Sequence, residues 1–189
     1  MSSTFANQLL IAMPNLKGAP FEESVIYVCQ HDQNGAMGLV LTYPIKPKLS
    51  DLFTQLEITL PKDTAIIENM PLFLGGPVEP EHGFILHSHH DKPLQSTIQI
   101  SSELFITTSK DILVAIAEDE GPDNTIVTLG YAGWSAGQLE KEIQEGSWLN
   151  APPSCDIIFD EDPKQKWTEA LKSIGIKDVS KLAGFSGHA

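Results

Sequence analysis

One run in the chain combines residue types that could hold a ligand. Between residues 126 and 143 an apolar stretch breaks into three glycines and then resumes with helical spacing. This pattern is typical of a strand, a tight glycine turn and a helix, whose first amides can bind a phosphate or carboxylate. Trp134 would stack on a flat ligand, and Gln138 would fix its orientation. The run therefore predicts a small-ligand or anion site.

The same run also has a purely structural interpretation, which we favour. Gly130 and Gly133 would permit a tight strand-to-helix turn, Trp134 would fill a gap in the core, and Ser135 would cap the helix. The spacing is neither the G-x-G-x-x-G of a dinucleotide fold nor a P-loop, which needs lysine and serine. Carboxylates of the helix, such as Glu142, would compete with a bound anion.

A second glycine segment, Gly75-Gly76-Pro77, has a similar ambiguity. Two glycines let a backbone approach a ligand closely, but they serve equally well in an abrupt turn between strands, which is the favoured interpretation. A pocket becomes the better explanation if the two glycine segments meet in space. The residues predicted to bind a ligand are Gly75, Gly76, Gly133, Trp134, Ser135 and Gln138.

No catalytic residue is predicted. Residues 133–137 read G-x-S-x-G, the pattern of a nucleophile elbow between strand and helix, so a hydrolase acting through Ser135 is a rival hypothesis. The chain is short for an α/β-hydrolase, and His188 is the only histidine downstream of this serine. Ser109, like Ser135, stands where a helix cap is expected.

Histidines cluster at His82, His87, His89 and His90, followed by Asp91. Imidazole and carboxylate groups are good transition-metal ligands, and a strand would place His87 and His89 on the same side. The segment is better explained as a polar loop, since structural zinc sites usually recruit cysteine. We predict neither a metal nor another cofactor.

Charge narrows the choice of partners. The chain has 25 acidic and 12 basic residues, a formal net charge of −13, and every basic residue is lysine. Because arginine provides the bidentate contacts to guanine and phosphate, direct nucleic-acid binding is disfavoured, and so is binding to anionic membranes. No helix-turn-helix pattern is present. A protein partner fits this composition better, and a small ligand is the alternative; the sequence does not predict an oligomeric state.

Length and cysteine content fit one cytoplasmic domain. The 189 residues are 41% hydrophobic, enough for a full core, so we expect a single domain over residues 1–189. The chain has no transmembrane stretch, and its start does not resemble a signal peptide, which favours the cytoplasm. Cys29 and Cys155 both fall in strand-like runs, where we expect buried, reduced thiols.

Short strands and short helices must position these residues. A turn at Asp32–Gly35 predicts a hairpin, residues 75–83 a structured connection, and the stretch after Leu56 a loop. Strands are predicted at Leu9–Met13, Val25–His31, Ala36–Thr42, Leu72–Leu74, Phe84–His87, Thr97–Ile100, Leu104–Thr107, in the run before Gly130, and at Cys155–Phe159. Helices are predicted from Ser50 to about Leu56, from Thr108 or Ser109 to Gly121-Pro122, after the glycine turn, and from Asp162-Pro163 to Gly175. This order requires a mixed sheet and predicts an α+β fold, not a doubly wound one.

Several ordered blocks resemble the AlgH/YqgE family. They include Leu-Ile-Ala-Met-Pro (10–14), Gly-Gly-Pro-Val (75–78), Gly-Tyr-Ala-Gly-Trp-Ser-Ala-Gly (130–137) and Ala-Gly-Phe-Ser-Gly-His-Ala (183–189), with further blocks at 24–31, 34–41, 83–87 and 107–113. The resemblance runs essentially from end to end. It implies a bacterial cytoplasmic protein without an assigned reaction, with a sheet that curls toward a barrel and short helices packed around it. Some members carry the label of transcriptional regulator, but the charge argument speaks against DNA contact.

Two functional hypotheses follow from the sequence. The favoured one is a non-enzymatic regulatory or interaction protein whose acidic surface binds a protein partner. The second is a small-ligand-binding protein, or an enzyme, that uses the glycine turn around Trp134.

Overall fold

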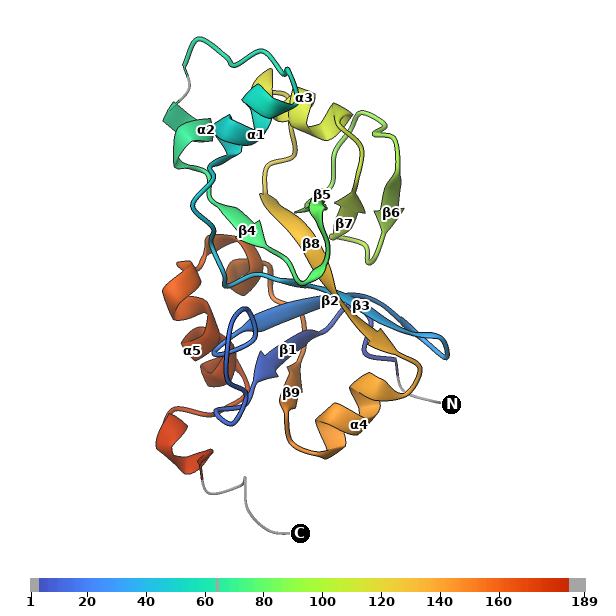
Figure 1. Cartoon of the computed structure of the whole chain (residues 1–189), viewed down its shortest axis with the longest axis vertical. Helices are drawn as coiled ribbons and strands as arrows, with labels where there is room; N and C mark the ends of the chain where they lie inside the picture. Colours follow the sequence, from blue (N-terminus) through green and yellow to red (C-terminus); the bar gives the residue numbers. More distant parts are fainter. Residues whose placement is uncertain (1–3, 64, 184–189) are drawn as a thin grey trace.

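The chain is built on one strongly curled sheet, shown by a computed structural model that describes residues 4–63 and 65–183 (Figure 1). The strands of this described part are β1 (Leu9–Ala12), β2 (Val25–Asp32), β3 (Gly35–Val40), β4 (Leu72–Leu74), β5 (Val78–His87), β6 (Thr97–Gln99), β7 (Phe105–Thr107), β8 (Thr125–Ser135) and β9 (Trp148–Ala151). Their order is β6-β7-β5-β8-β3-β2-β1-β9, with β4 paired to β8 outside this path. The β4–β8 pair is parallel and the path is antiparallel. The predicted α+β fold with a mixed, curled sheet is confirmed.

Strand β8 connects the two halves of the sheet, and Figure 1 shows it running from the upper group of strands into the lower one. Its first half pairs with β4 and β5, and its second half pairs with β3. Gly130 lies between them with φ 71°, opposite a register shift in β5, which is the geometry of a bulge that bends a strand. The predicted turn beginning at Gly130 is therefore wrong. The strand continues to Ser135, and only residues 136 and 137 separate it from the next helix.

Short helices cover both ends of the sheet. The helices of the described residues are α1 (Leu49–Gln55), α2 (Ala65–Asn69), α3 (Asp111–Ala117), α4 (Gln138–Gln144) and α5 (Pro163–Ser173), with a π-helix at Asp156–Asp160 and a 3₁₀ helix at Val179–Lys181. In Figure 1, α1, α2 and α3 lie at the top, and α4 and α5 lie beside the lower strands. Nowhere in the described ranges is a helix long and apolar enough to cross a membrane.

Local capping and one long-range hydrogen bond fix helix α5. The Asp162 carboxylate accepts from the amide of Lys164 at 2.8 Å, and Pro163 occupies the first helical position, as the sequence predicts. Gly175, with φ 89°, follows the end of the helix. The indole N–H of Trp167 donates to the carbonyl oxygen of Ala12 at 2.9 Å and so ties α5 to β1.

The prediction of a late strand at Cys155–Phe159 is wrong. This segment forms the π-helix instead, and the last strand, β9, lies before it at Trp148–Ala151. The run has the β-branched and aromatic residues of a strand, but Pro152 and Pro153 separate it from β9, and Ile157 and Ile158 are buried in the core cluster beside Trp167. Core packing therefore outweighs local propensity here.

The start of α1 differs from the prediction. Ser50 lies inside the helix, and Lys48 is the capping residue. The Asp51 carboxylate accepts from the backbone N–H of Lys48 at 2.7 Å, so a side chain one turn into the helix satisfies the free donor. The stretch predicted as a loop contains α2, whose five residues are too short to give a periodic signal.

Two other boundaries also move. Strand β5 begins at Val78, inside the predicted connection over residues 75–83. Helix α3 begins at Asp111, and the Ser109 hydroxyl lies within hydrogen-bonding distance of the Asp111 carboxylate and the Gln95 carbonyl instead of capping the helix. The predicted turn at Asp32–Gly35 is confirmed, with the Asn34 amide donating to Asp32 at 2.7 Å.

The two cysteines occupy different environments. Cys29 is partly buried, and burial raises the pKa of its thiol. Cys155 is exposed at the start of the π-helix, so the expectation that it is buried is wrong. Partial desolvation, followed by the carboxylates of Glu103, Asp156 and Asp160, raises the pKa of Cys155. A raised pKa makes a thiol less reactive at neutral pH.

Candidate functional site

The two predicted glycine segments meet in the structure. Gly75 donates its backbone N–H to the carbonyl oxygen of Leu129 in β8 at 2.8 Å. A Cβ atom on Gly75 would lie 2.3 Å from the carbonyl oxygen of Gly130, and one on Gly76 would lie 2.0 Å from the carbonyl carbon of Tyr131. These glycines therefore allow two backbone segments to pack directly on each other.

Trp134 lies near the end of β8 and belongs to a core cluster. Its side chain is 7% exposed. Its indole ring meets that of Trp148 edge to face, with centroids 6.3 Å apart. The Trp134 N–H donates to a carboxylate oxygen of Glu142 at 2.8 Å. Most of the Trp134 ring is therefore packed in the core and is not available to stack on a ligand.

Glu142 on α4 collects several hydrogen bonds. The same oxygen that accepts from Trp134 also accepts from the indole N–H of Trp148 at 2.9 Å, and the second oxygen accepts from the Gln138 amide at 2.9 Å. Gln138 in turn accepts from the backbone N–H of Ser135 at 3.0 Å. The backbone amide of Ser135 and the side chain of Gln138 are therefore already engaged within the protein.

Ser135 lacks the surroundings of a nucleophile within the part of the chain that the structure describes. Its hydroxyl is exposed and donates to Gln138 at 3.2 Å. His31 lies on β2, which pairs with β3 beside the end of β8. Both of its ring nitrogens are engaged, one with the Phe5 amide at 3.0 Å and the other with Glu140 at 2.9 Å. His188 lies outside the described residues. A serine needs a positioned base to react, and no described side chain supplies it.

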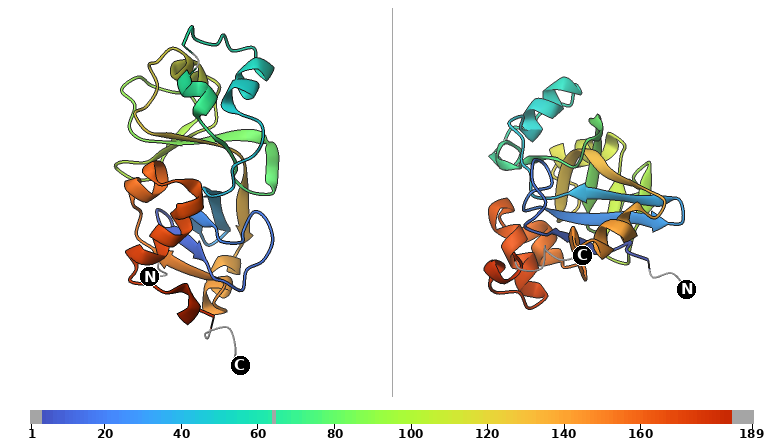
Figure 2. Two further views of the ribbon diagram at one scale, coloured as in Figure 1. Left: turned by 90° about the vertical axis from the view of Figure 1, so that its left-hand side faces the viewer. Right: turned by 60° about the horizontal axis from the view of Figure 1, so that its bottom comes forward.

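An open hollow of about 460 Å³ lies beside the β2–β3 hairpin and the end of β8. Figure 2 shows these strands projecting from the body of the molecule. The lining residues are Gln30, Asp32, Asn34, Gly35, Ala36, Met37, Val78, Tyr131, Gly133 and Trp134. Of the six residues predicted to bind a ligand, Gly133 and Trp134 thus line the hollow. We call it the hairpin hollow.

The hairpin hollow joins apolar and acidic groups. Met37, Tyr131 and Val78 contribute apolar surface, and Val78 is 36% exposed. The Asn34 backbone N–H, and after it the side-chain amide of Gln30, keep the pKa of Asp32 below its usual value. The hollow therefore keeps a negative charge at neutral pH beside its apolar surface.

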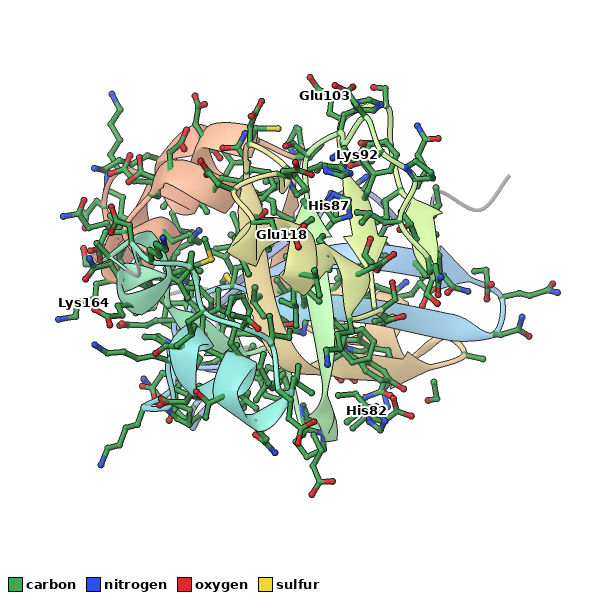
Figure 3. All side chains as sticks on the ribbon, turned by 90° about the horizontal axis from the view of Figure 1, so that it is seen from above. His82, His87, Lys92, Glu103, Glu118 and Lys164 are labelled. Atoms are coloured by element: carbon green, nitrogen blue, oxygen red, sulfur yellow. The ribbon has the colours of Figure 1, made fainter. Side chains whose placement is uncertain are left out.

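Among the described residues, the four histidines that cluster in the sequence do not converge on one metal site. His82 lies far from His87 (Figure 3). His87 is buried, with its ring nitrogens 2.7 Å from the Ser88 carbonyl and 2.7 Å from the Thr107 hydroxyl, and burial lowers its pKa. Both ring nitrogens of His90 face backbone carbonyls at 2.7 Å. Among the described residues no group of three histidine, cysteine or carboxylate side chains is placed to hold a metal ion.

A second hollow, of about 350 Å³, is lined by a buried lysine that no motif of the sequence marks as functional. Lys166 on α5 is 2% exposed, and its ammonium group donates to the carbonyl oxygen of Ile158 in the π-helix. One signal was available, because helical spacing places Lys166 on the same face as Trp167, Ala170 and Leu171. We call this the lysine hollow.

Solved structures place the fold in a known class. The solution structure of the AlgH protein from Pseudomonas aeruginosa matches with a TM-score of 0.78 and 37% identity, over 100% of this chain and 98% of that one. A crystal structure from Corynebacterium diphtheriae matches with a TM-score of 0.69 over 96% of this chain and 91% of that one. At 19% identity, this second match shows the fold alone.

Sequence relatives are equally consistent. A UPF0301 protein from Hahella chejuensis is 48% identical over 190 residues, covering 99% of this chain and 97% of the relative. One from Legionella pneumophila is 42% identical over 188 residues, covering 99% and 98%. The model of the AlgH-like family matches residues 9–178. The chain belongs to the AlgH-like family, which confirms the resemblance inferred from its sequence blocks.

Proposed function

We propose that this protein is a non-enzymatic regulatory module of the cytoplasm that binds a basic segment of a partner protein in the hairpin hollow. The observation that carries the proposal is the open hollow itself, in which apolar side chains lie beside an ionised Asp32. An open surface with an apolar centre and a charged rim is typical of a protein interface.

Charge selects the chemistry of the partner. The chain has a formal net charge of −13, and Glu79 and Glu81 follow Val78 on the exposed part of β5. Complementary charge raises association rates and disfavours acidic partners. A segment carrying lysine or arginine next to an apolar residue would fit both the rim and the floor of the hollow. Regulation by direct DNA contact is disfavoured for the same reason.

Filling the hollow tests this proposal. A Cβ atom at Gly133 would make only ordinary contacts, 3.5 Å from Tyr131 and 3.7 Å from Val78, so Gly133→Leu should occupy the hollow without displacing backbone. A photo-crosslinking residue at Asn34, on the hollow, is expected to capture a discrete protein partner in cells, at a basic segment. In the Gly133→Leu background we expect this adduct to fall at least about fivefold, as a hot-spot loss of over about 1 kcal/mol implies.

Ile98 provides the matched control. It is an apolar side chain 64% exposed on β6, at the opposite end of the sheet order from β9 and away from the hollow. The crosslinker at position 98 should not give the adduct seen from position 34. The same adduct from both positions, or an adduct unaffected by Gly133→Leu, would argue against the hollow as the binding surface.

Small-ligand binding around Trp134 is the alternative proposal, favoured by the fact that Gly133 and Trp134 line the hollow. A thermal-shift and tryptophan-fluorescence screen with nucleotides and small acids separates the two. A ligand that stabilises the wild type but not Gly133→Leu would support the alternative. No response in either assay, together with a protein adduct from position 34, would support the interaction module.

A further inference from the structure

The lysine hollow places a buried amine where a small molecule could reach it. It lies between β4, the start of β8, the end of the π-helix and the first turns of α5, and it shares no lining residue with the hairpin hollow. Phe73, Ile126 and Phe159 form apolar walls. The lysine hollow is therefore a separate site from the hairpin hollow.

Two polar groups at the lysine hollow have unused hydrogen-bonding capacity. An ammonium group has three N–H donors, and within the described residues Lys166 uses one of them, toward Ile158. Thr125, which lines the same hollow, has a buried hydroxyl that finds no hydrogen-bond partner in the described part of the chain. Buried polar groups are normally satisfied, so these two groups set the wall of the lysine hollow apart from an ordinary apolar core.

The environment of Lys166 favours its neutral form. Burial lowers the pKa of Lys166 to about 8, against the opposing effect of the carboxylates of Glu161, Asp160 and Asp162. The walls from β4 and β8 bring no charged side chain to the hollow among the described residues. A neutral amine is the form that attacks a carbonyl carbon. At pH 8 about half of such a group is neutral, against on the order of 0.4% of an ordinary lysine.

We propose that Lys166 is a reactive amine that binds a small neutral or cationic aldehyde in the lysine hollow as an imine. The nitrogen lone pair adds to the carbonyl carbon while the carbonyl π electrons move to oxygen. The two amine hydrogens then leave with that oxygen as water, so an amine and an aldehyde give an imine and water. The step consumes no oxidant or reductant.

The acidic residues and the apolar walls define the class of aldehyde. Asp160 and Asp162 are exposed at the solvent side of the hollow, with Glu161 half-buried between them. Three adjacent carboxylates disfavour an anionic aldehyde, whereas Phe73 and Phe159 favour an alkyl or aryl group. A short neutral aldehyde fits both conditions.

Reductive trapping on the folded full-length protein tests the proposal. Butanal with cyanoborohydride at pH 8, followed by peptide mass spectrometry, gives a labelling rate for each lysine. We expect Lys166 to be labelled at least roughly tenfold faster than Lys164, which is exposed and points outward from α5 (Figure 3). The Lys166 rate should level off above about pH 8, while the Lys164 rate should continue to rise. Glyoxylate, an anionic aldehyde, should lose this preference.

The matched variants are Lys166→Met and Lys164→Met. The first should abolish the fast labelling and the second should leave it unchanged. The comparison of lysines within the wild type needs no variant, so it holds even where Lys166→Met impairs folding. Labelling of Lys166 at or below the Lys164 rate would overturn the proposal. Equal preference for glyoxylate and butanal would overturn the assigned class of aldehyde.

Discussion

Gly76→Ala is expected to lower the free energy of unfolding by about 3 kcal/mol or more. The new Cβ atom would lie 2.0 Å from the carbonyl carbon of Tyr131 and 2.2 Å from the backbone nitrogen of Ala132. Neither atom belongs to a flexible side chain, so β8 itself must move. Gly76 also has φ 156°, a conformation that alanine rarely adopts. Urea unfolding followed by tryptophan fluorescence would measure this loss of free energy. In thermal unfolding, the melting temperature should be roughly 6–12 °C lower.

Gly137→Ala is the matched control. Gly137 has φ 75°, but a Cβ atom there would meet nothing within 4 Å. This variant keeps the backbone strain and the change in unfolded-state entropy but adds no clash, and should cost only about 1 kcal/mol. Similar losses in both variants would mean that contact between the glycine segments does not hold β8 in place.

The sequence alone could not predict the role of Gly76 and Gly130. Glycine indicates freedom of the backbone, but not whether that freedom serves a turn, a ligand or a close approach between segments. At Gly130 the answer depends on Gly76, 54 positions earlier in the chain, whose carbonyl oxygen would lie 2.5 Å from a Cβ atom. A contact across that separation leaves no local pattern, which is why a turn was predicted where a strand continues.

Features determined by neighbouring residues are predicted well. Asp162-Pro163 sets the start of α5 because the cap and its amide are two residues apart, and Asp32–Gly35 sets the hairpin for the same reason. The π-helix at Asp156–Asp160 could not be predicted, because burial of its isoleucines determines its conformation. The lysine hollow depends in turn on that π-helix, whose Ile158 carbonyl receives Lys166.

Glu142→Ala is expected to lower the free energy of unfolding by about 2–4 kcal/mol, because it removes the shared acceptor of two indole N–H groups. Both rings are buried, Trp148 at 3% exposure, so water cannot fully replace the carboxylate. In a ¹H–¹⁵N spectrum the indole signals of Trp134 and Trp148 should shift upfield. Trp167, which donates to Ala12 on another face of the sheet, should not shift.

Glu145→Ala, at the residue that directly follows α4, is the control. Glu145 is exposed and pairs with Lys141 at 3.7 Å, a surface contact worth under about 0.5 kcal/mol. Equal stability of the two variants would contradict a structural role for Glu142.

Because Glu142 joins α4 to β8 through Trp134, its loss should also loosen the wall of the hairpin hollow. Crosslinking from Asn34 should then decrease in Glu142→Ala and remain unchanged in Glu145→Ala, which connects the stability of this end of β8 to partner binding.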